Sequence, residues 1–98
     1  MKIVWSLFAI SDREAIFNYI EADSPRAAAR IDDLIEAQVD ALAAFPEVGR
    51  PGRVAGTREL VIRQTPYIVA YQIENDVVKA LRVLHGAQQW PSEVEEQA

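Results

Sequence analysis

Apolar and polar positions alternate in two ways along this chain, and each way predicts a different element. The segment 2–8 (KIVWSLF) is apolar and contains Ile, Val and Trp, which favour a β-strand. Beyond residue 25, apolar side chains recur at every third or fourth position, which is the spacing of an amphipathic helix. This apolar stripe consists of Ala28, Ile31, Leu34, Ile35, Val39, Leu42 and Phe45.

Capping residues mark the starts of two helices. Ser11 and Glu14 have the spacing of a capping box, so we predict that a first helix begins there. Ser24 is a good N-cap for the second helix, because Pro25 behind it suits the first helical position. The link between the two helices is short, and it predicts an antiparallel helix hairpin.

The second half of the chain has the pattern of three strands. The segment 45–57 contains two prolines and three glycines, which predicts a loop. The segments 58–64, 67–73 and 77–85 then read as strands, and a tight turn joins the last two. The predicted order of elements is β-α-α-β-β-β.

This order predicts an α+β fold. We expect a two-layer sandwich in which the helix hairpin packs on an antiparallel four-stranded sheet. The first strand must join the sheet at an edge, and we expect it beside the last strand. One domain covers residues 1–91, and residues 92–98 form an acidic C-terminal tail.

Composition narrows the chemistry that this fold can carry. The 98 residues are 50% hydrophobic and 26% charged, as in a soluble globular domain, and no run is long enough to cross a bilayer. The chain has no cysteine and one histidine, which disfavours a zinc site. We therefore expect a cytoplasmic protein without metal or cofactor. A net charge of −5 makes direct DNA binding by this chain an unfavourable hypothesis.

Four segments resemble a known family when their order and spacing are taken together. They are YIEADSPRAAARID, FPEVGRPGRVAGTREL, PYIVAYQI and LRVLHGAQQWP, and a Trp precedes them on the first predicted strand. They resemble the RelE/ParE superfamily of toxins from type II toxin–antitoxin modules, from about Lys2 to Pro91. The resemblance implies a hetero-oligomer with a cognate antitoxin, ParD-like or similar. It also implies that an amphipathic helix and an extended segment of the antitoxin cover apolar grooves and a sheet edge.

The superfamily contains RelE-like toxins, which cleave mRNA on the ribosome without metal, and ParE-like toxins, which poison DNA gyrase. RelE-like members commonly place an arginine after the tyrosine that opens the central strand, whereas Ile68 follows Tyr67 here. They also carry basic residues after the last strand, where this chain has the uncharged GAQQ at 86–89. The residues therefore favour a ParE-like toxin that inhibits growth by acting on gyrase and has no chemistry of its own.

Two alternatives remain open. The first is a RelE-like mRNA interferase that uses His85 as acid or base, with Arg82, Arg58 and Arg63 around it. A histidine at a strand end is also commonly an exposed ring bonded to the backbone. The second alternative is an inactive member that binds its antitoxin and nothing else.

Basic and aromatic residues of the second half are candidates for contact with the target. They are Arg50, Arg53, Arg58, Arg63, Arg82 and Trp90. Each also has a structural interpretation: local pairs such as Arg58 with Glu59, a helix carboxylate for Arg82, and a C-terminal anchor for Trp90. Asp32, Glu36 and Asp40 repeat at helical spacing and are interpreted as a solvated helix face rather than a metal site. The sequence does not predict which residues bind the antitoxin.

Overall fold

The structure is a computed structural model that describes residues 1–88, and its elements follow the predicted order with two short additions. A 3₁₀-helix, η1, extends the second helix, and a two-residue strand, β2, precedes the predicted second strand. The elements in chain order are β1 (Lys2–Trp5), α1 (Leu7–Glu21), α2 (Pro25–Asp40), η1 (Ala41–Ala43), β2 (Arg50–Pro51), β3 (Arg58–Val61), β4 (Tyr67–Glu74) and β5 (Val77–His85).

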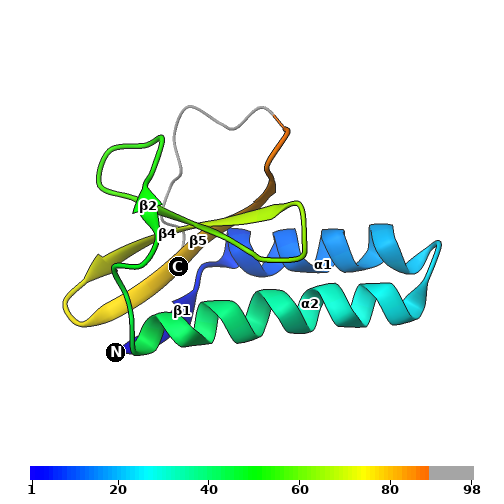
Figure 1. Ribbon diagram of the computed structural model, residues 1–98, viewed down its shortest axis with the longest axis horizontal. Coiled ribbons are helices and arrows are strands. Elements are labelled where there is room, and N and C mark those ends of the chain that lie inside the picture. The colour runs from blue at the N-terminus through cyan, green and yellow to red at the C-terminus, as the bar shows by residue number, and fades with distance from the viewer. Residues whose placement is uncertain (89–98) are drawn as a thin grey trace.

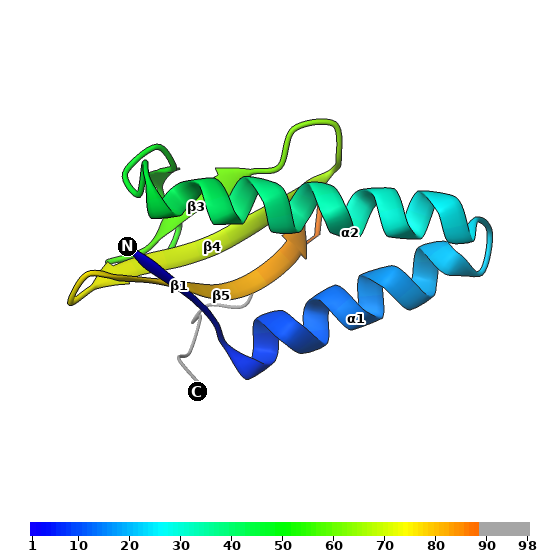
Figure 2. The same cartoon turned by 90° about the horizontal axis from the view of Figure 1, so that it is seen from below.

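The sheet and the helix hairpin form two layers, as predicted. The strand order is β1-β5-β4-β3-β2, so the first strand does lie beside the last one. Both helices cover the same face of the sheet (Figure 1). The turn between the helices projects beyond the end of the strands, as the view from below shows (Figure 2). The α+β class is therefore confirmed.

The predicted antiparallel four-stranded sheet needs two corrections. It has five strands, because β2 pairs with Arg58 and Glu59 of β3. It is also mixed, because β1 runs parallel to β5. The parallel pair follows from the path of the chain. The helix hairpin returns the chain to the start of β1, where the Met1 ammonium donates to the Ala43 carbonyl at 2.9 Å. Strand β3 runs in the direction of β1, and the two antiparallel pairings β3–β4 and β4–β5 bring β5 into that same direction.

The predicted start of the first helix at Ser11 is wrong. Helix α1 begins at Leu7, and Ser6 is its N-cap. The Ser6 hydroxyl accepts a hydrogen bond from the Ala9 N–H at 3.0 Å and donates one to the Leu81 carbonyl of β5 at 2.8 Å. Ser6 is fully buried. A cap that also bonds the sheet outweighs the local capping-box pattern, and Ser11 lies exposed in the first turns of the helix.

The start of the second helix is as predicted. The Ser24 hydroxyl accepts from the Ala27 N–H at 3.1 Å, and Pro25 occupies the first turn. The apolar stripe faces the sheet, and its buried members are Ala28, Ile31, Ile35, Val39 and Leu42. Phe45, which continues the stripe in the sequence, lies beyond the helix and is 69% exposed.

One arginine links the two helices to each other and to β1. Arg13 of α1 forms two hydrogen bonds, at 3.0 and 2.9 Å, with the Asp32 carboxylate of α2. Its guanidinium also lies 4.5 Å from the centre of the Trp5 ring, a distance at which a cation is attracted to the aromatic face. Trp5 is partly buried and packs against the core. Asp32, interpreted as part of a solvated helix face, is partly covered by its pairing with Arg13.

Tyr71 of β4 fixes the loop between η1 and β2. Its hydroxyl donates to the Pro46 carbonyl at 2.7 Å and accepts from the Gly49 N–H at 2.9 Å. A Cβ at residue 49 would lie 2.5 Å from this hydroxyl, so the loop requires glycine there. Burial raises the pKa of Tyr71 above its ordinary value.

Substitution of Ser6 by Ala should lower the free energy of unfolding by about 2–3 kcal/mol. The variant loses a helix cap and leaves the buried Leu81 carbonyl without its donor. Urea denaturation monitored by far-UV circular dichroism measures the change. Ser11→Ala is the matched control, and it should change stability by less than about 0.5 kcal/mol. Equal losses of stability in the two variants would contradict the assignment of Ser6 as the N-cap of α1.

The raised pKa of Tyr71 predicts a loss of stability in alkali. The unfolded chain releases this proton near pH 10, whereas the folded chain holds it to higher pH. The stability that this bound proton contributes is therefore fully present below about pH 10 and is lost as the pH rises through the folded pKa. Tyr71→Phe should be less stable at pH 7, by about 2 kcal/mol, and should decline less steeply between pH 10 and 11. Parallel curves for the two proteins would contradict this.

Candidate functional site

His85 is the last residue of β5, and the turn that follows forms hydrogen bonds with both its backbone and its ring. Its N–H donates to the Gln88 side chain at 2.8 Å, and its Nδ1 accepts from the Ala87 N–H at 3.1 Å. The ring contacts Tyr67 edge-on, with 5.6 Å between the ring centres. Because Nδ1 is an acceptor, the neutral ring carries its proton on Nε2. The side chain is exposed, as in the structural interpretation of this residue.

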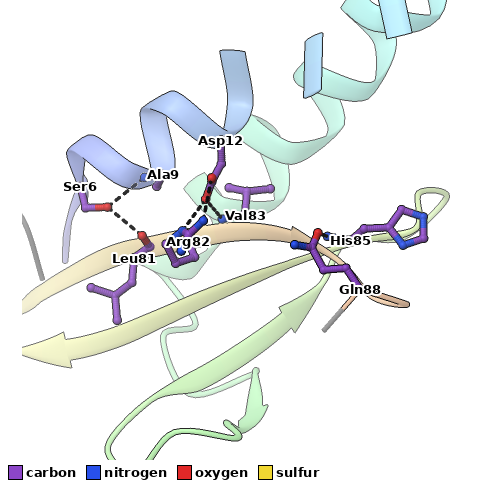
Figure 3. A network of polar contacts seen from close by, with 8 residues as sticks. All are labelled: Ser6, Ala9, Asp12, Leu81, Arg82, Val83, His85 and Gln88. Atoms are coloured by element: carbon purple, nitrogen blue, oxygen red, sulfur yellow. Dashed lines mark hydrogen bonds and ion pairs between the residues drawn. The ribbon is translucent and has the colours of Figure 1, made fainter. Parts of the chain in front are cut away.

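Arg82 pairs with a helix carboxylate, which is one of its two predicted roles. Its guanidinium binds both oxygens of Asp12 in α1, at 2.8 and 3.0 Å (Figure 3). The same carboxylate accepts from the Val83 N–H at 2.9 Å. These hydrogen bonds raise the pKa of Arg82 above its ordinary value. The planar, two-bond geometry is the strong form of an arginine–carboxylate pair.

Arg50 and Arg53 surround a buried carboxylate on the face of the sheet that points away from the helices. Glu59 has a side chain 2% exposed, and Arg50 bonds its Oε1 through two nitrogens, at 3.0 and 3.2 Å. The Arg53 N–H donates to Oε2 at 2.9 Å. The arginine side chains themselves remain 53% and 43% exposed. Each therefore serves as a structural partner and still presents positive charge to the surface.

The other two arginines of this region behave differently from each other. Arg58 points back at the loop, where it donates to the Gly49 carbonyl at 2.8 Å and the Glu47 carbonyl at 3.2 Å. The expected local pair of Arg58 with Glu59 is not what forms, because Glu59 bonds Arg50 and Arg53. Arg63 is exposed, and within residues 1–88 its side chain contacts no carboxylate.

Two arginines of the alternative catalytic set have structural partners. Arg82 is held at the α1 edge, and Arg58 is bound to the loop beside β2. His85 is oriented by backbone and Gln88 groups, and no carboxylate in the described part of the chain bonds its ring. Trp90, the remaining target candidate, and the acidic tail 92–98 lie outside the described residues. Across 1–88, no three His, Cys, Asp or Glu side chains gather as metal ligands would.

The structure contains an apolar groove between α2 and β3, of the kind that the resemblance implied. It measures about 350 Å³ and is lined by Gln38, Ala41, Leu42, Phe45, Val48, Leu60, Val61 and Arg63. Phe45, Val48 and Val61 are between 47% and 69% exposed. The signal in the sequence was Phe45, an aromatic residue past the helix end. A second exposed apolar group, Leu7, Phe8 and Ile10, lies at the start of α1. Neither helix of the described chain has the length and apolarity to span a bilayer.

Comparison with known proteins agrees with this fold along nearly its whole length. Residues 3–90 match the family described as the ParE toxin of the type II toxin–antitoxin system parDE. A Sinorhizobium fredii protein proposed as a toxin, Y4kP, is 50% identical over 90 residues, covering 92% of this chain and 93% of that protein. Toxin RelE2 of Caulobacter vibrioides is 37% identical over 86 residues, covering 88% and 96%.

A solved structure is also similar. The chromosomal ParDE toxin–antitoxin system from P. aeruginosa contains a chain with a TM-score of 0.78 and 27% identity, covering 87% of this chain and 95% of that one. Fold and matches together define a toxin of the RelE/ParE superfamily. Within that superfamily, the chain belongs to the ParE toxin family of type II toxin–antitoxin systems.

The Asp12–Arg82 pair should behave as a link between α1 and β5. Asp12→Ala should cost about 2–3 kcal/mol of stability, since it leaves the Arg82 charge and the Val83 N–H without their acceptor. Arg82→Met should cost less, and the double variant should fall short of the sum by about 1–2 kcal/mol. Asp33→Ala, at an exposed position of α2, is the control and should be near neutral. Additive losses in this double-mutant cycle would show that the two side chains do not interact.

Proposed function

We propose that this ParE-family toxin stops growth by binding and poisoning DNA gyrase and is held inactive by a cognate antitoxin. The observation that carries the choice of target is the pairing of Arg82 with Asp12. The pairing commits the arginine nearest His85 in sequence to a structural contact. The family match supports the same choice, and the P. aeruginosa relative comes from a system named for a toxin and its antitoxin.

Metal-free RNA cleavage needs groups that this end of the sheet does not bring together. One group must remove the proton of the 2′-hydroxyl, one must stabilise the phosphorane charge, and one must protonate the leaving oxygen. His85 has its Nε2 available, but the nearest described residues after it, 86–88, carry no charge. Burial raises the pKa of Tyr67, whose ring contacts that of His85, so this hydroxyl is a poor group for removing the 2′-hydroxyl proton. A binding poison requires none of these groups, nor a metal or cofactor.

Surface arginines are the proposed contacts with the target. Arg50 and Arg53 are held in place by Glu59, so their half-exposed guanidinium groups lose little further freedom on binding. Arg63 offers an exposed cation beside the apolar groove. Arg58, Arg82 and Trp90 remain candidates of the same kind. An acidic chain with this local positive charge suits an acidic surface on its partner.

The antitoxin is proposed to cover the exposed apolar side chains. Phe45, Val48 and Val61 at the α2–β3 groove, and Leu7 and Ile10 on α1, leave apolar area in water. Burying such area is the usual driving force for association, and a partner that binds the folded toxin also stabilises it. We propose that this toxin, a single domain over residues 1–91 with an acidic tail at 92–98, forms a hetero-oligomer with its antitoxin in the cytoplasm.

Two assays with purified toxin test the choice of target. The toxin should inhibit DNA supercoiling by gyrase and trap cleaved DNA, and it should leave labelled mRNA intact on translating ribosomes. Added antitoxin should restore supercoiling. His85→Ala should inhibit gyrase as the unaltered toxin does, because the proposed mechanism uses no acid or base at this position.

Two other results would decide against the proposal. Cleavage of mRNA in the ribosome that disappears in His85→Ala would assign the chain to the RelE-like interferases; the Caulobacter relative carries the name RelE. No effect in either assay, with normal growth during expression, would identify an inactive member that binds its antitoxin alone.

A further inference from the structure

The outer edge of β1 is open in the described part of the chain. Strand β1 stands at one end of the strand order and leads directly into α1 (Figure 2). The Ser6 N–H donates to the Ala80 carbonyl of β5 at 2.9 Å. Successive peptide groups of a strand face opposite sides, so those of Ile3 and Trp5 face away from β5. Within residues 1–88, no hydrogen bond reaches these outward groups.

Exposed apolar side chains gather around this open edge. Met1 precedes β1 and is 46% exposed, and Leu7, the first residue of α1, is 62% exposed. Phe8 and Ile10 follow in the first turn of α1. These four are half of the eight large apolar side chains that are exposed in the described chain. An open strand edge with apolar neighbours is a template for pairing with another strand.

The pattern of this edge is symmetric about Val4. Ile3 and Trp5, whose peptide groups face outward, stand one residue before and one residue after it. The exposed Met1 and Leu7 stand three residues before and three residues after it. A surface that has the same pattern in both directions along the strand is complementary to a second copy of itself in the antiparallel orientation.

We propose that two copies of the free toxin pair antiparallel through β1, with Val4 opposite Val4 of the second copy. In this register Ile3 lies opposite Trp5 of the second copy, and each such pair exchanges two hydrogen bonds, as opposed residues of an antiparallel ladder do. All the open peptide groups of both strands are then paired. A register shifted by two residues would set Ile3 or Trp5 opposite a residue outside β1.

The side chains at this edge fit the same register. Met1 comes opposite Leu7 of the second copy, so an exposed apolar pair closes each end of the contact. Lys2 comes opposite Ser6, which is uncharged, and no like charges are directly opposed. The two five-stranded sheets become one continuous sheet across a two-fold axis.

The pairing should be weak and confined to toxin without antitoxin. A four-residue strand with a few flanking side chains lies at the low end of specific interfaces, which bury about 1,200–2,000 Å² when they are stable. The net charge of −5 on each copy adds a repulsion that salt screens. The proposed antitoxin contact also covers Leu7, so one occupant excludes the other there. The inference does not depend on which target the toxin has.

Sedimentation of the full toxin, freed from its antitoxin, tests the pairing over a concentration series. The toxin should pass from monomer to dimer between about 1 µM and 1 mM, and added salt should shift this transition to lower concentration. Val4→Glu sets two carboxylates opposite each other at the centre of the contact and should weaken the dimer at least about tenfold. Within one copy, the introduced carboxylate lies beside Lys79, so the fold should be kept.

Gln72→Glu is the matched control. Gln72 of β4 is the neighbour of Lys79 on its other side, so this variant adds the same charge beside the same lysine but away from the open edge. It should dimerise as the wild-type toxin does. Equal weakening in the two variants, unweakened dimerisation by Val4→Glu, or a wild-type toxin that stays monomeric up to about 1 mM would each overturn the inference.

Amide hydrogen exchange gives a second measurement that needs no variant. The Ile3 and Trp5 N–H groups should exchange rapidly in dilute toxin and slowly at concentrations where the dimer forms. The Val4 N–H faces β5 and should exchange slowly throughout, which makes it the internal control. Protection of Ile3 and Trp5 that appears with antitoxin or gyrase, and not with toxin concentration, would assign the edge to that partner and overturn pairing between copies. The supercoiling and mRNA assays do not involve these measurements, so the two proposals can fail separately.

Discussion

The outer edge of β5 is closed by the side chains of a helix, and the position of the whole hairpin depends on that contact. Strand β1 pairs with Val77 to Ala80 and then turns away. Ser6 and Asp12 take over from it, because one donates to the Leu81 carbonyl and the other accepts from the Val83 N–H. The side chains of Ser6, the N-cap of α1, and of Asp12 thus bond the part of the β5 edge that β1 does not pair with.

Arg82 follows from this arrangement. A carboxylate placed against a strand edge is partly removed from water, and its charge then needs a partner. Arg82 neutralises Asp12 and ties the helix to the strand from the same side. Its engagement is therefore a consequence of how the sheet edge is closed. An arginine three residues from the one histidine thus pairs with a helix carboxylate.

The opposite side of the sheet uses the same device under different conditions. Gln38 satisfies the peptide of Arg63 from α2, as Ser6 and Asp12 satisfy that of β5 from α1. Ser6 is fully buried, so replacing its bonds would expose core, whereas the contact of Gln38 with Arg63 is at the surface. Two helices therefore close two edges, one with a fully buried hydroxyl and one with an amide at the surface.

Local patterns in the sequence predicted those features that local contacts decide. Ser24 and Pro25 start α2 because both act within one turn of the helix. Ser6 could not be predicted as the N-cap because its second partner, Leu81, is 75 residues away, whereas Ser11 and Glu14 have a complete local capping pattern. The direction of β1 could have been deduced from the hairpin and the two turns that follow. The two-residue β2 has too few residues for any periodicity.

The same distinction between local and distant contacts applies to the residues of the candidate site. The lack of charge in the segment after β5 is visible in the sequence itself. For Arg82 the sequence allowed two roles, and the choice between them required the position of Asp12. Gln38 gives no signal in the sequence, since a glutamine on a polar helix position reads as solvated.

Glu59 shows best why composition alone misjudges the surface. In a sum of charges over the sequence, the Glu59 carboxylate cancels the charge of one arginine. In the structure it fixes the positions of Arg50 and Arg53, whose side chains stay about half exposed. The charge that remains is therefore ordered before any partner arrives, which lowers the entropy lost on binding.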